Sequence, residues 1–269
     1  MRLQRTVEGE LNRLFVFELS DGLRVEGVLY RGDTLCVSTQ VGCPVRCVFC
    51  ASGRYGFIRN LKAEEIYGQL ELVRSFHGIR RIAVAGIGEP LANWRNVKVA
   101  FERFRREGLR VSFYTCGFPL SNLPQLLRMP HNGVTLSLHT ADPATRAELM
   151  PGAGDLPQLL QLLRKLLPTL SRRKRKKISL ALVLLKGVND SAGDLLRFAE
   201  LAQSLGVGIT LLRYNEVGVF ESPDEEEFEK AFLLLRRQGI RVTLSTRFRR
   251  ERIGGCGTLT VGGRLPRGG

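Results

Sequence analysis

The chain has 269 residues, of which 43% are hydrophobic, and it carries a formal net charge of +15. This length allows one large domain or two small ones, and this hydrophobic content is typical of a globular protein. No apolar run approaches the length of a membrane span, and the first residues, MRLQRTVEGELNRL, lack the apolar stretch of a signal peptide. Six cysteines without such a signal favour a reducing compartment over a disulfide framework. We therefore expect a cytoplasmic, monomeric protein without a membrane partner.

The excess of basic residues has two explanations. Genome composition or a high growth temperature raises the arginine content without a functional reason. A polyanionic partner is the other explanation, because lysine and arginine neutralise the phosphates of a nucleic acid. Two dense basic runs, at 172–177 and 247–252, favour this second explanation. The charge pattern therefore predicts binding to RNA or DNA.

From residue 34 onward, β-forming runs alternate with amphipathic helical patterns. The predicted strands are 34–39, 81–86, 109–115, 133–138, 178–185 and 207–213, with 240–245 as a candidate extra strand. The predicted helices are 62–76, 93–107, 120–129, 155–168, 191–204 and 224–238. This alternation is typical of βαβ units around a parallel sheet and indicates the α/β class.

Two earlier runs, 13–19 and 23–30, flank Asp21-Gly22 and predict an antiparallel hairpin. Six βα units fall short of a closed eight-fold barrel, so we predict a partial (β/α)6 TIM-like barrel with a small N-terminal β extension. A doubly wound open sheet is the alternative. The expected divisions are the β extension at 1–33, the partial barrel at 34–246 and a carboxyl-terminal segment at 247–269.

Ligands of both architectures bind beyond the carboxyl ends of the strands. Each of the six predicted core strands ends at, or is followed by, a polar or glycine-rich motif. In chain order these motifs are CPVRCVFC (43–50), GIGEP (86–90), YTCG (114–117), SLH (137–139), KGVND (186–190) and RYN (213–215). The sequence therefore predicts one functional site at this end of the sheet.

The most informative motif is a CxxxCxxC run formed by Cys43, Cys47 and Cys50. A structural zinc site requires four ligands, and the nearest downstream histidine, His77, falls at the end of a predicted helix. A redox pair at Cys47 and Cys50 would leave Cys43 without a role. Iron–sulfur clusters are held by cysteine thiolates, usually four, so three thiolates would leave one iron open to a small molecule. The spacing favours such a cluster and leaves zinc and redox sites as alternatives.

This motif after the first strand of a partial barrel resembles the radical S-adenosylmethionine (SAM) superfamily. The resemblance implies that the three cysteines bind one [4Fe–4S] cluster, whose open iron takes the amino and carboxylate groups of SAM. The aromatic Phe49 and the GIGEP motif strengthen the resemblance. The implied SAM-binding residues are Gly88, Glu89, Tyr114, Ser137, His139 and Asn215. At Tyr114 the family usually has a serine, so this contact departs from the pattern.

Longer segments resemble the RlmN/Cfr family of radical SAM RNA methyltransferases. They are TLCVSTQVGCPVRCVFCASGRYGFIRNL, GIGEPLANW, SLHTADPATRAELMP, LLKGVNDS and GGCGTL, spread from Thr34 to Leu259. The resemblance implies methylation of carbon-2 or carbon-8 of an adenine in RNA, with 23S ribosomal RNA as the expected substrate. Another RNA, such as transfer RNA, is one alternative, and an RNA-binding protein with a structural metal site is another. An electron donor of the flavodoxin or ferredoxin type is implied as a partner.

The resemblance also assigns catalytic roles outside the cluster motif. Cys256 matches a cysteine that is first methylated by SAM and then gives up a hydrogen atom to a 5′-deoxyadenosyl radical. The resulting methylene radical adds to the base, and Cys36 matches the cysteine that resolves the protein–RNA adduct and leaves a disulfide. Glu26 matches a proposed general base. Cys116 has no matching role, so we expect it to be structural.

The sequence departs from larger family members at both ends. Only about a dozen residues precede the first predicted strand, so the family's accessory domain, implicated in RNA engagement, is expected to be absent. About a dozen residues follow Cys256, and the segment before it, RFRRERIGG, is more basic than in the family. We expect the two basic runs to take over part of the RNA-backbone binding.

Overall fold

The computed structural model describes residues 1–75, 77–218 and 220–261, and part of the expected carboxyl-terminal segment, 262–269, lies outside them. A 10-stranded sheet forms the centre of the molecule, and its strands lie in sequence order. They are β1 (Arg2–Glu8), β2 (Asn12–Glu18), β3 (Arg24–Tyr30), β4 (Thr34–Val37), β7 (Arg81–Val84), β8 (Arg110–Thr115), β9 (Gly133–Ser137), β10 (Ile178–Leu184), β11 (Gly208–Arg213) and β12 (Val242–Leu244). Strands β1 to β4 pair antiparallel, and β4 and β7 to β12 pair parallel.

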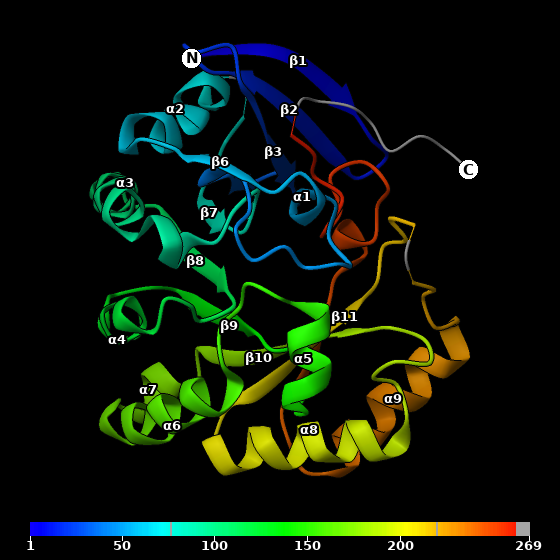
Figure 1. Ribbon diagram of the computed structural model, residues 1–269. Coiled ribbons are helices and arrows are strands. Elements are labelled where there is room, and N and C mark those ends of the chain that lie inside the picture. The colour runs from blue at the N-terminus through cyan, green and yellow to red at the C-terminus, as the bar shows by residue number, and fades with distance from the viewer. Residues whose placement is uncertain (76, 219, 262–269) are drawn as a thin grey trace.

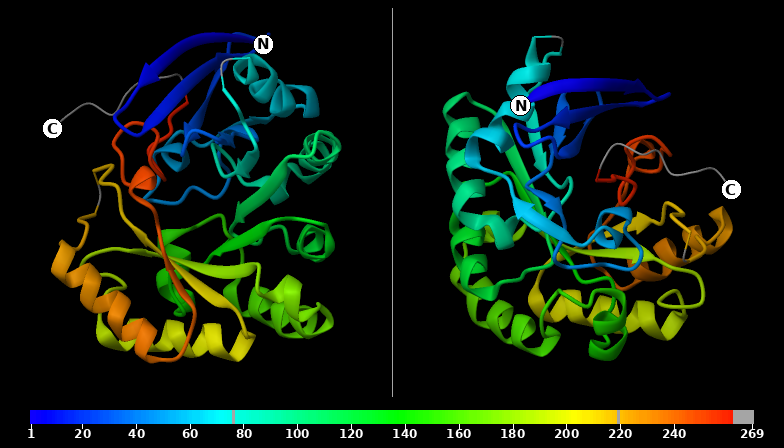
Figure 2. Two further views of the ribbon diagram at one scale, coloured as in Figure 1. Left: turned by 180° about the vertical axis from the view of Figure 1, so that it is seen from behind. Right: turned by 45° about the horizontal axis from the view of Figure 1, so that its top comes forward.

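The major helices follow the outer side of the curved sheet (Figures 1 and 2). They are α2 (Ala63–Arg74), α3 (Trp94–Arg106), α4 (Leu123–Arg128), α6 (Leu156–Leu166), α8 (Ala192–Leu205) and α9 (Glu225–Arg237). A doubly wound sheet would reverse its strand order and carry helices on both faces. The strand order here does not reverse, so the prediction of a partial (β/α)6 barrel is confirmed and the doubly wound alternative is wrong.

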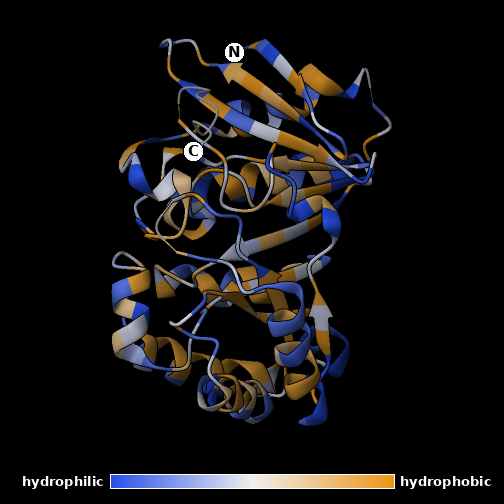
Figure 3. Ribbon diagram, turned by 90° about the vertical axis from the view of Figure 1, so that its right-hand side faces the viewer, coloured by the Kyte–Doolittle hydropathy of each residue, from blue (hydrophilic) through white to orange (hydrophobic). Residues whose placement is uncertain are grey.

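The hydrophobic pattern accounts for these layers. Val97, Phe101 and Phe104 recur on one face of α3 and are buried. Figure 3 shows the same division, with hydrophobic strands in the centre and helices that carry alternating hydrophobic and hydrophilic bands. Within the described residues, no helix combines the length and apolarity needed to span a bilayer.

The predicted hairpin around Asp21-Gly22 is confirmed as β2 and β3, and the candidate strand at 240–245 is confirmed as β12. Other elements were not predicted: β1, the separate pair β5 (Gln40–Gly42) and β6 (Phe57–Asn60), and the short helices α1 (Ala51–Arg54), α5 (Pro143–Leu149) and α7 (Arg172–Arg175). Most of β1 is exposed, and α1 and α7 each have only four residues. Such elements carry little hydrophobic periodicity, which is the signal that sequence patterns supply.

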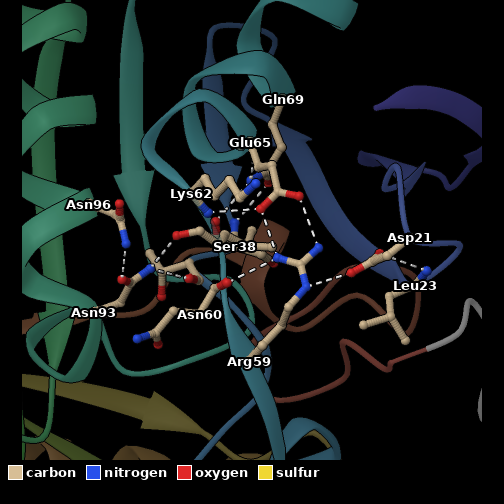
Figure 4. A network of polar contacts seen from close by, with 12 residues as sticks. Asp21, Leu23, Ser38, Arg59, Asn60, Lys62, Glu65, Gln69, Asn93 and Asn96 are labelled. Carbon is tan, nitrogen blue, oxygen red and sulfur yellow. Dashed lines mark hydrogen bonds and ion pairs between the residues drawn. The ribbon is translucent and has the colours of Figure 1, made fainter.

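A polar network fixes the chain that follows the cysteine motif (Figure 4). The Arg59 guanidinium donates to Asp21 of the β2–β3 turn at 2.7 Å and to Glu65 of α2 at 2.8 Å. Asn93 donates from its amide to the backbone oxygens of Thr39 and Leu61, at 2.7 and 2.8 Å. These bonds hold the two ends of the cysteine-containing segment against the barrel.

Candidate active site

One pocket lies at the carboxyl ends of the parallel strands and encloses approximately 1000 Å³, open solvent at its mouth included. This is large enough for a cofactor-sized ligand. Its lining combines residues from the first to the last predicted motif and from the carboxyl-terminal segment. The predicted residues among them are Cys43, Cys47, Cys50, Gly88, Glu89, Tyr114, Ser137, His139, Asn215 and Cys256. Five of the six predicted motifs thus meet at one pocket, whereas KGVND (186–190) contributes no residue to its lining.

The cysteine motif forms a compact loop pinned by backbone hydrogen bonds. The Cys43 N–H donates to the Gly56 oxygen at 2.8 Å, and the Val48 N–H donates to the Leu149 oxygen at 3.0 Å. Gly53 packs so closely that a Cβ atom there would lie 2.6 Å from the Cys47 backbone oxygen. The loop thereby turns three thiols toward one pocket.

The three thiols of the cysteine motif line the same pocket. Three thiolates that each bind one iron of a [4Fe–4S] cluster would leave the fourth iron without a protein ligand. Among the described residues, no group of three His, Cys, Asp or Glu side chains is arranged to hold a single metal ion. His77, the histidine considered for zinc, instead contacts Arg13, with 2.8 Å between its Nε2 and the Arg13 Nη1.

Gly88 and Glu89 connect β7 to the pocket. Gly88 has φ +108°, and a Cβ atom there would lie 2.7 Å from the Gln40 side chain, so glycine is required. The buried Glu89 carboxylate accepts hydrogen bonds from the backbone N–H groups of Cys116 at 2.7 Å and Leu91 at 3.0 Å, and from the Thr115 hydroxyl. Glu89 thus fixes the end of β8 as well as lining the pocket.

His139 is held as a neutral imidazole. Its Nδ1 accepts the Val183 backbone N–H at 3.0 Å, so its remaining proton is on Nε2. Burial lowers the pKa of His139 to about 3. The ring packs edge-on against Phe49 of the cysteine motif, with 5.0 Å between ring centroids.

Asn189 supports His139 from the neighbouring loop. Its buried side-chain amide donates to the backbone oxygens of His139 and Val183 at 2.8 and 2.9 Å, and it accepts the Leu185 N–H at 2.8 Å. The motif KGVND predicted a loop here but gave no role to this residue. Asn189 ties the ends of β9 and β10 together beneath the pocket.

Replacing Asn189 by Ala is expected to lower the free energy of unfolding by about 3 kcal/mol, because one donor and two acceptors lose their buried partner. The corresponding fall in melting temperature is roughly 5–10 °C. Thermal unfolding followed by circular dichroism measures this change. Asp190→Ala is a control in the same loop, since it removes one exposed hydrogen bond to Gly187. Equal effects of the two variants would contradict the bridging role of Asn189.

The loop that carries Cys256 is held by Asn215. The Asn215 amide donates to the backbone oxygens of Arg249 and Cys256 at 2.7 and 2.8 Å. The Cys256 N–H closes the loop on the Arg249 oxygen at 3.1 Å. Gly254 and Gly257 have φ values of +73° and +80°, which glycine adopts at low cost. The residue predicted to bind SAM therefore also positions the exposed thiol of Cys256.

Arg249 is a site residue that the sequence did not reveal, because it lies within a run expected to bind RNA phosphates. Its guanidinium carbon lies 4.4 Å from the ring centroid of Tyr114 and 5.9 Å from that of Tyr30. Its Nη2 donates to the Tyr114 hydroxyl, and its Nη1 lies 3.7 Å from the Cys256 sulfur. Arg249 thus places a fixed positive charge beside the thiol.

A second, adjoining pocket contains Cys36. It encloses approximately 540 Å³, and Cys36, Cys50, Arg249 and Cys256 are among its lining residues. Burial raises the pKa of Cys36 to about 12, and the nearby Cys256 contributes to this shift. Both are free thiols, so the disulfide implied by the resemblance is not present. Cys256 lines both pockets and lies between the cysteine motif and Cys36.

Glu26 lies outside the linings of both pockets. It is buried in β3, where its carboxylate accepts the Thr260 N–H at 2.7 Å and the Thr260 hydroxyl at 3.2 Å. Figures 1 and 2 show the carboxyl-terminal segment beside β3. Glu26 therefore anchors this segment, while its role as a general base stays a prediction.

Burial raises the pKa of Glu26 to about 7, against 4.5 for an ordinary glutamate. Because the folded protein binds this proton more tightly than the unfolded chain does, protonation of Glu26 stabilises the fold. This stabilisation is complete below pH 4.5 and is lost as the pH rises through 7. The parent protein should lose about 3 kcal/mol of its free energy of unfolding over this pH range, and we expect the Glu26→Gln variant to lose none of it. The melting temperature of the variant relative to the parent protein should rise between about pH 5 and about pH 8. A constant difference over this range would contradict a raised pKa.

Cys116 and Arg146 complete the wall of the site. Cys116 is buried and lines the main pocket, so a fourth thiol lies near the cysteine motif. The fully buried Arg146 guanidinium donates to the backbone oxygens of Cys116 at 3.0 Å and Gly154 at 2.8 Å. No motif predicted this arginine, which joins the loop after α5 to the end of β8.

Comparison with known proteins agrees with this site. Residues 37–199 match the family model of the radical SAM superfamily. The dual-specificity RNA methyltransferase RlmN of Desulfosudis oleivorans is 35% identical over 85% of this chain and 65% of its own length. Probable RNA methyltransferases of Thiobacillus denitrificans and Stutzerimonas stutzeri are 37% and 34% identical, over 92% and 95% of this chain and 69% and 77% of their own lengths.

A solved structure is also similar. The crystal structure of a radical SAM methyltransferase from Sphaerobacter thermophilus superposes with a TM-score of 0.84 and 27% identity, covering 96% of this chain and 80% of its own. The present chain spans about two thirds of the length of the Desulfosudis relative, of which it covers 65%. The matched ranges contain the cysteine motif and most of the pocket. The chain therefore belongs to the radical SAM superfamily and, within it, to the RlmN-type RNA methyltransferases.

Proposed function

We propose that this protein methylates carbon-2 or carbon-8 of an adenine in RNA, with 23S ribosomal RNA as the substrate, through an S-methylated Cys256. The position of Cys256 carries the proposal. Its thiol lines the pocket of the cysteine motif and also the pocket of Cys36. A methyl group on this sulfur would therefore lie between a cofactor site and a second thiol. The RNA methyltransferase names of the relatives support an RNA substrate.

The residues present fit the cofactors of the superfamily. Cys43, Cys47 and Cys50 would hold a [4Fe–4S] cluster, and the SAM contacts would come from Gly88, Glu89, Tyr114, Ser137, His139 and Asn215. When bound, the cluster and SAM together would supply the radical chemistry needed to functionalise an unactivated carbon. Tyr114 is already engaged by Arg249, so its ring would form a wall beside SAM.

Cys256 would act twice. Its thiolate first takes the methyl group of SAM: an S–C bond forms, the methyl–sulfonium bond breaks, and the thiol proton leaves to solvent. The Arg249 Nη1 lies 3.7 Å from this sulfur and would hold it in place during the transfer. Once this carbon is bonded to the base, the Cys36 thiolate would attack the Cys256 sulfur: an S–S bond forms, the S–C bond breaks with its electron pair left on the methylene carbon, and that carbon takes up a proton to become the methyl group. An external thiol reductant would restore both cysteines.

Glu26 would receive the proton that the adenine carbon loses. A carboxylate with a pKa near 7 is suited to proton transfer at neutral pH. Because its carboxylate is bonded to Thr260, this role requires the carboxyl-terminal segment to shift or a water molecule to relay the proton. The anchoring contact and the proton transfer therefore use the same group.

An acidic electron-transfer protein of the flavodoxin or ferredoxin type would dock beside the cysteine motif. Tyr55, Phe57 and Ile58 are 47%, 47% and 51% exposed, which is high for large apolar side chains. Arg46 and Arg54 line the same outer depression, and so does the ligand residue Cys47. This apolar and basic surface offers an acidic partner a short path to the cluster.

The test is methylation of RNA by the anaerobically reconstituted enzyme with reductant and methyl-labelled SAM. Mass spectrometry of digested 23S ribosomal RNA and transfer RNA should reveal a methyladenosine whose fragmentation distinguishes carbon-2 from carbon-8. If only transfer RNA is methylated, the substrate is transfer RNA and not 23S ribosomal RNA. Reductive SAM cleavage without any methyladenosine in either RNA would overturn the proposal.

A further inference from the structure

A cavity of approximately 1000 Å³, open solvent included, extends from the amino ends of β7 and β8 to the residues that follow β12. Arg81 and Arg110, at the starts of β7 and β8, line it together with Arg31 from the β3–β4 turn. Ser245 and Thr246, which follow β12, line another part. Tyr114 and Arg249 line both this cavity and the active-site pocket, so they separate the two. The amino-end cavity is thus a distinct, strongly basic compartment.

The arginines of this cavity are placed side by side. Arg81 and Arg110 are register partners on adjacent parallel strands, and both line the cavity. Like charges on neighbouring strands repel each other unless an anion lies between them. Arg81 pairs with Asp33 at 3.2 Å. The guanidinium groups of Arg31 and Arg110 have no carboxylate partner in the described part of the chain.

The side chains of Arg31 and Arg110 are exposed, so a ligand can reach their guanidinium groups. Guanidinium groups are donors that hold a tetrahedral oxyanion.

The surrounding face is basic as well. The last helical turns and the segments that join them to the next strand lie at this side of the barrel, and they contain Arg80, Arg105, Arg106, Arg128, the run 172–177 and Arg241. Lys174 and Lys177 donate to the backbone oxygens of Arg128 and His131, which draws the run toward Asn132 of the cavity lining. Glu107 is the carboxylate that these segments contain. Basic residues near helix ends complement the helix dipole, but this explains only those in the last helical turns.

We propose that the amino end of the barrel is a phosphate-binding site, in which Arg31, Arg81 and Arg110 hold the oxyanion. The phosphate comes either from an RNA backbone that extends around the barrel or from free inorganic phosphate. The basic run 172–177 forms the rim of the site. The site lies apart from the methyl-transfer pocket and does not depend on which base is modified.

The experiment compares Arg110→Gln with Arg95→Gln in the reconstituted protein. The Arg110→Gln substitution breaks no ion pair within the described residues. The Arg95→Gln control removes the same charge from an exposed position on α3, on a different surface. Binding of inorganic phosphate is measured by calorimetry, and binding of a mixed-sequence RNA oligonucleotide by fluorescence anisotropy at several salt concentrations. Arg110→Gln should weaken the affinity about tenfold for whichever of the two ligands, RNA or inorganic phosphate, occupies the site. For RNA, it should also reduce the salt slope by about 1.

The two titrations distinguish the sources of phosphate. Loss of RNA affinity without measurable phosphate binding assigns the site to the backbone, whereas loss of phosphate affinity alone assigns it to free phosphate. Unchanged iron content and circular dichroism establish that Arg110→Gln is folded. If Arg110→Gln and Arg95→Gln give the same affinities in both titrations, the amino-end site is rejected. Each titration measures binding only, so its result stands whether or not the protein methylates adenine.

Discussion

Replacing Cys256 by Ala is expected to abolish methyl transfer to RNA while reductive cleavage of SAM continues. Cys256 lies outside the cysteine motif, so its loss leaves the cluster ligands intact. The backbone of residue 256 accepts the Asn215 hydrogen bond and donates to the Arg249 oxygen, and alanine retains both contacts. The exposed side chain contributes little to folding. Methylated RNA should fall below detection, while 5′-deoxyadenosine, measured by chromatography, continues to form.

A Cys36→Ala variant provides the matched control for Cys256→Ala. It keeps the methyl-carrying thiol but removes the second thiol of the adjoining pocket. This variant should therefore retain RNA on the protein as a covalent adduct, visible as a shift in a denaturing gel. Methyl transfer by the Cys256→Ala variant at the parent rate would show that the methyl group does not pass through this sulfur.

The barrel could be predicted because each of its elements has a strong local signal. The alternation of strand and helix patterns identified every parallel strand from β4 to β12, and Asp21-Gly22 marked the β2–β3 hairpin. Cys43, Cys47 and Cys50 could be predicted to share one site because all three lie within eight consecutive positions. Gly88 and Asn215 follow predicted strands and Ser137 closes one, and the parallel topology alone brings such positions together.

Other parts of the site could not be predicted because their signals are not local. Arg249 belongs to a basic run that looks solvent-exposed, yet it packs between Tyr30 and Tyr114 from two distant strands. Arg146 resembles any polar helix residue until the fold places backbone oxygens around its guanidinium. Glu26 has the residue type of a base, but its partner Thr260 is 234 positions away.

Replacing Cys47 by Ala is expected to remove the cluster, whereas replacing Cys116 by Ala should retain it. Four buried or half-buried thiols line the pocket: Cys43, Cys47, Cys50 and Cys116. Three belong to the cysteine motif, while Cys116 directly follows β8 and has its backbone fixed by Glu89 and Arg146. If only the loop thiols bind iron, one iron remains open to SAM. Iron analysis should therefore give about four iron atoms per chain for Cys116→Ala and close to none for Cys47→Ala.

The same pair of variants separates an open cluster from a closed one. With four thiolate ligands, every iron would be coordinated by protein, and SAM would have no site on the metal. In that case Cys116→Ala would either lose iron or gain SAM cleavage that the parent protein lacks. We instead expect Cys116→Ala to cleave SAM like the parent protein, apart from a destabilisation of about 1 kcal/mol from the lost sulfur in the core. Cys47→Ala should cleave none, because the buried loop would no longer hold the iron that SAM requires.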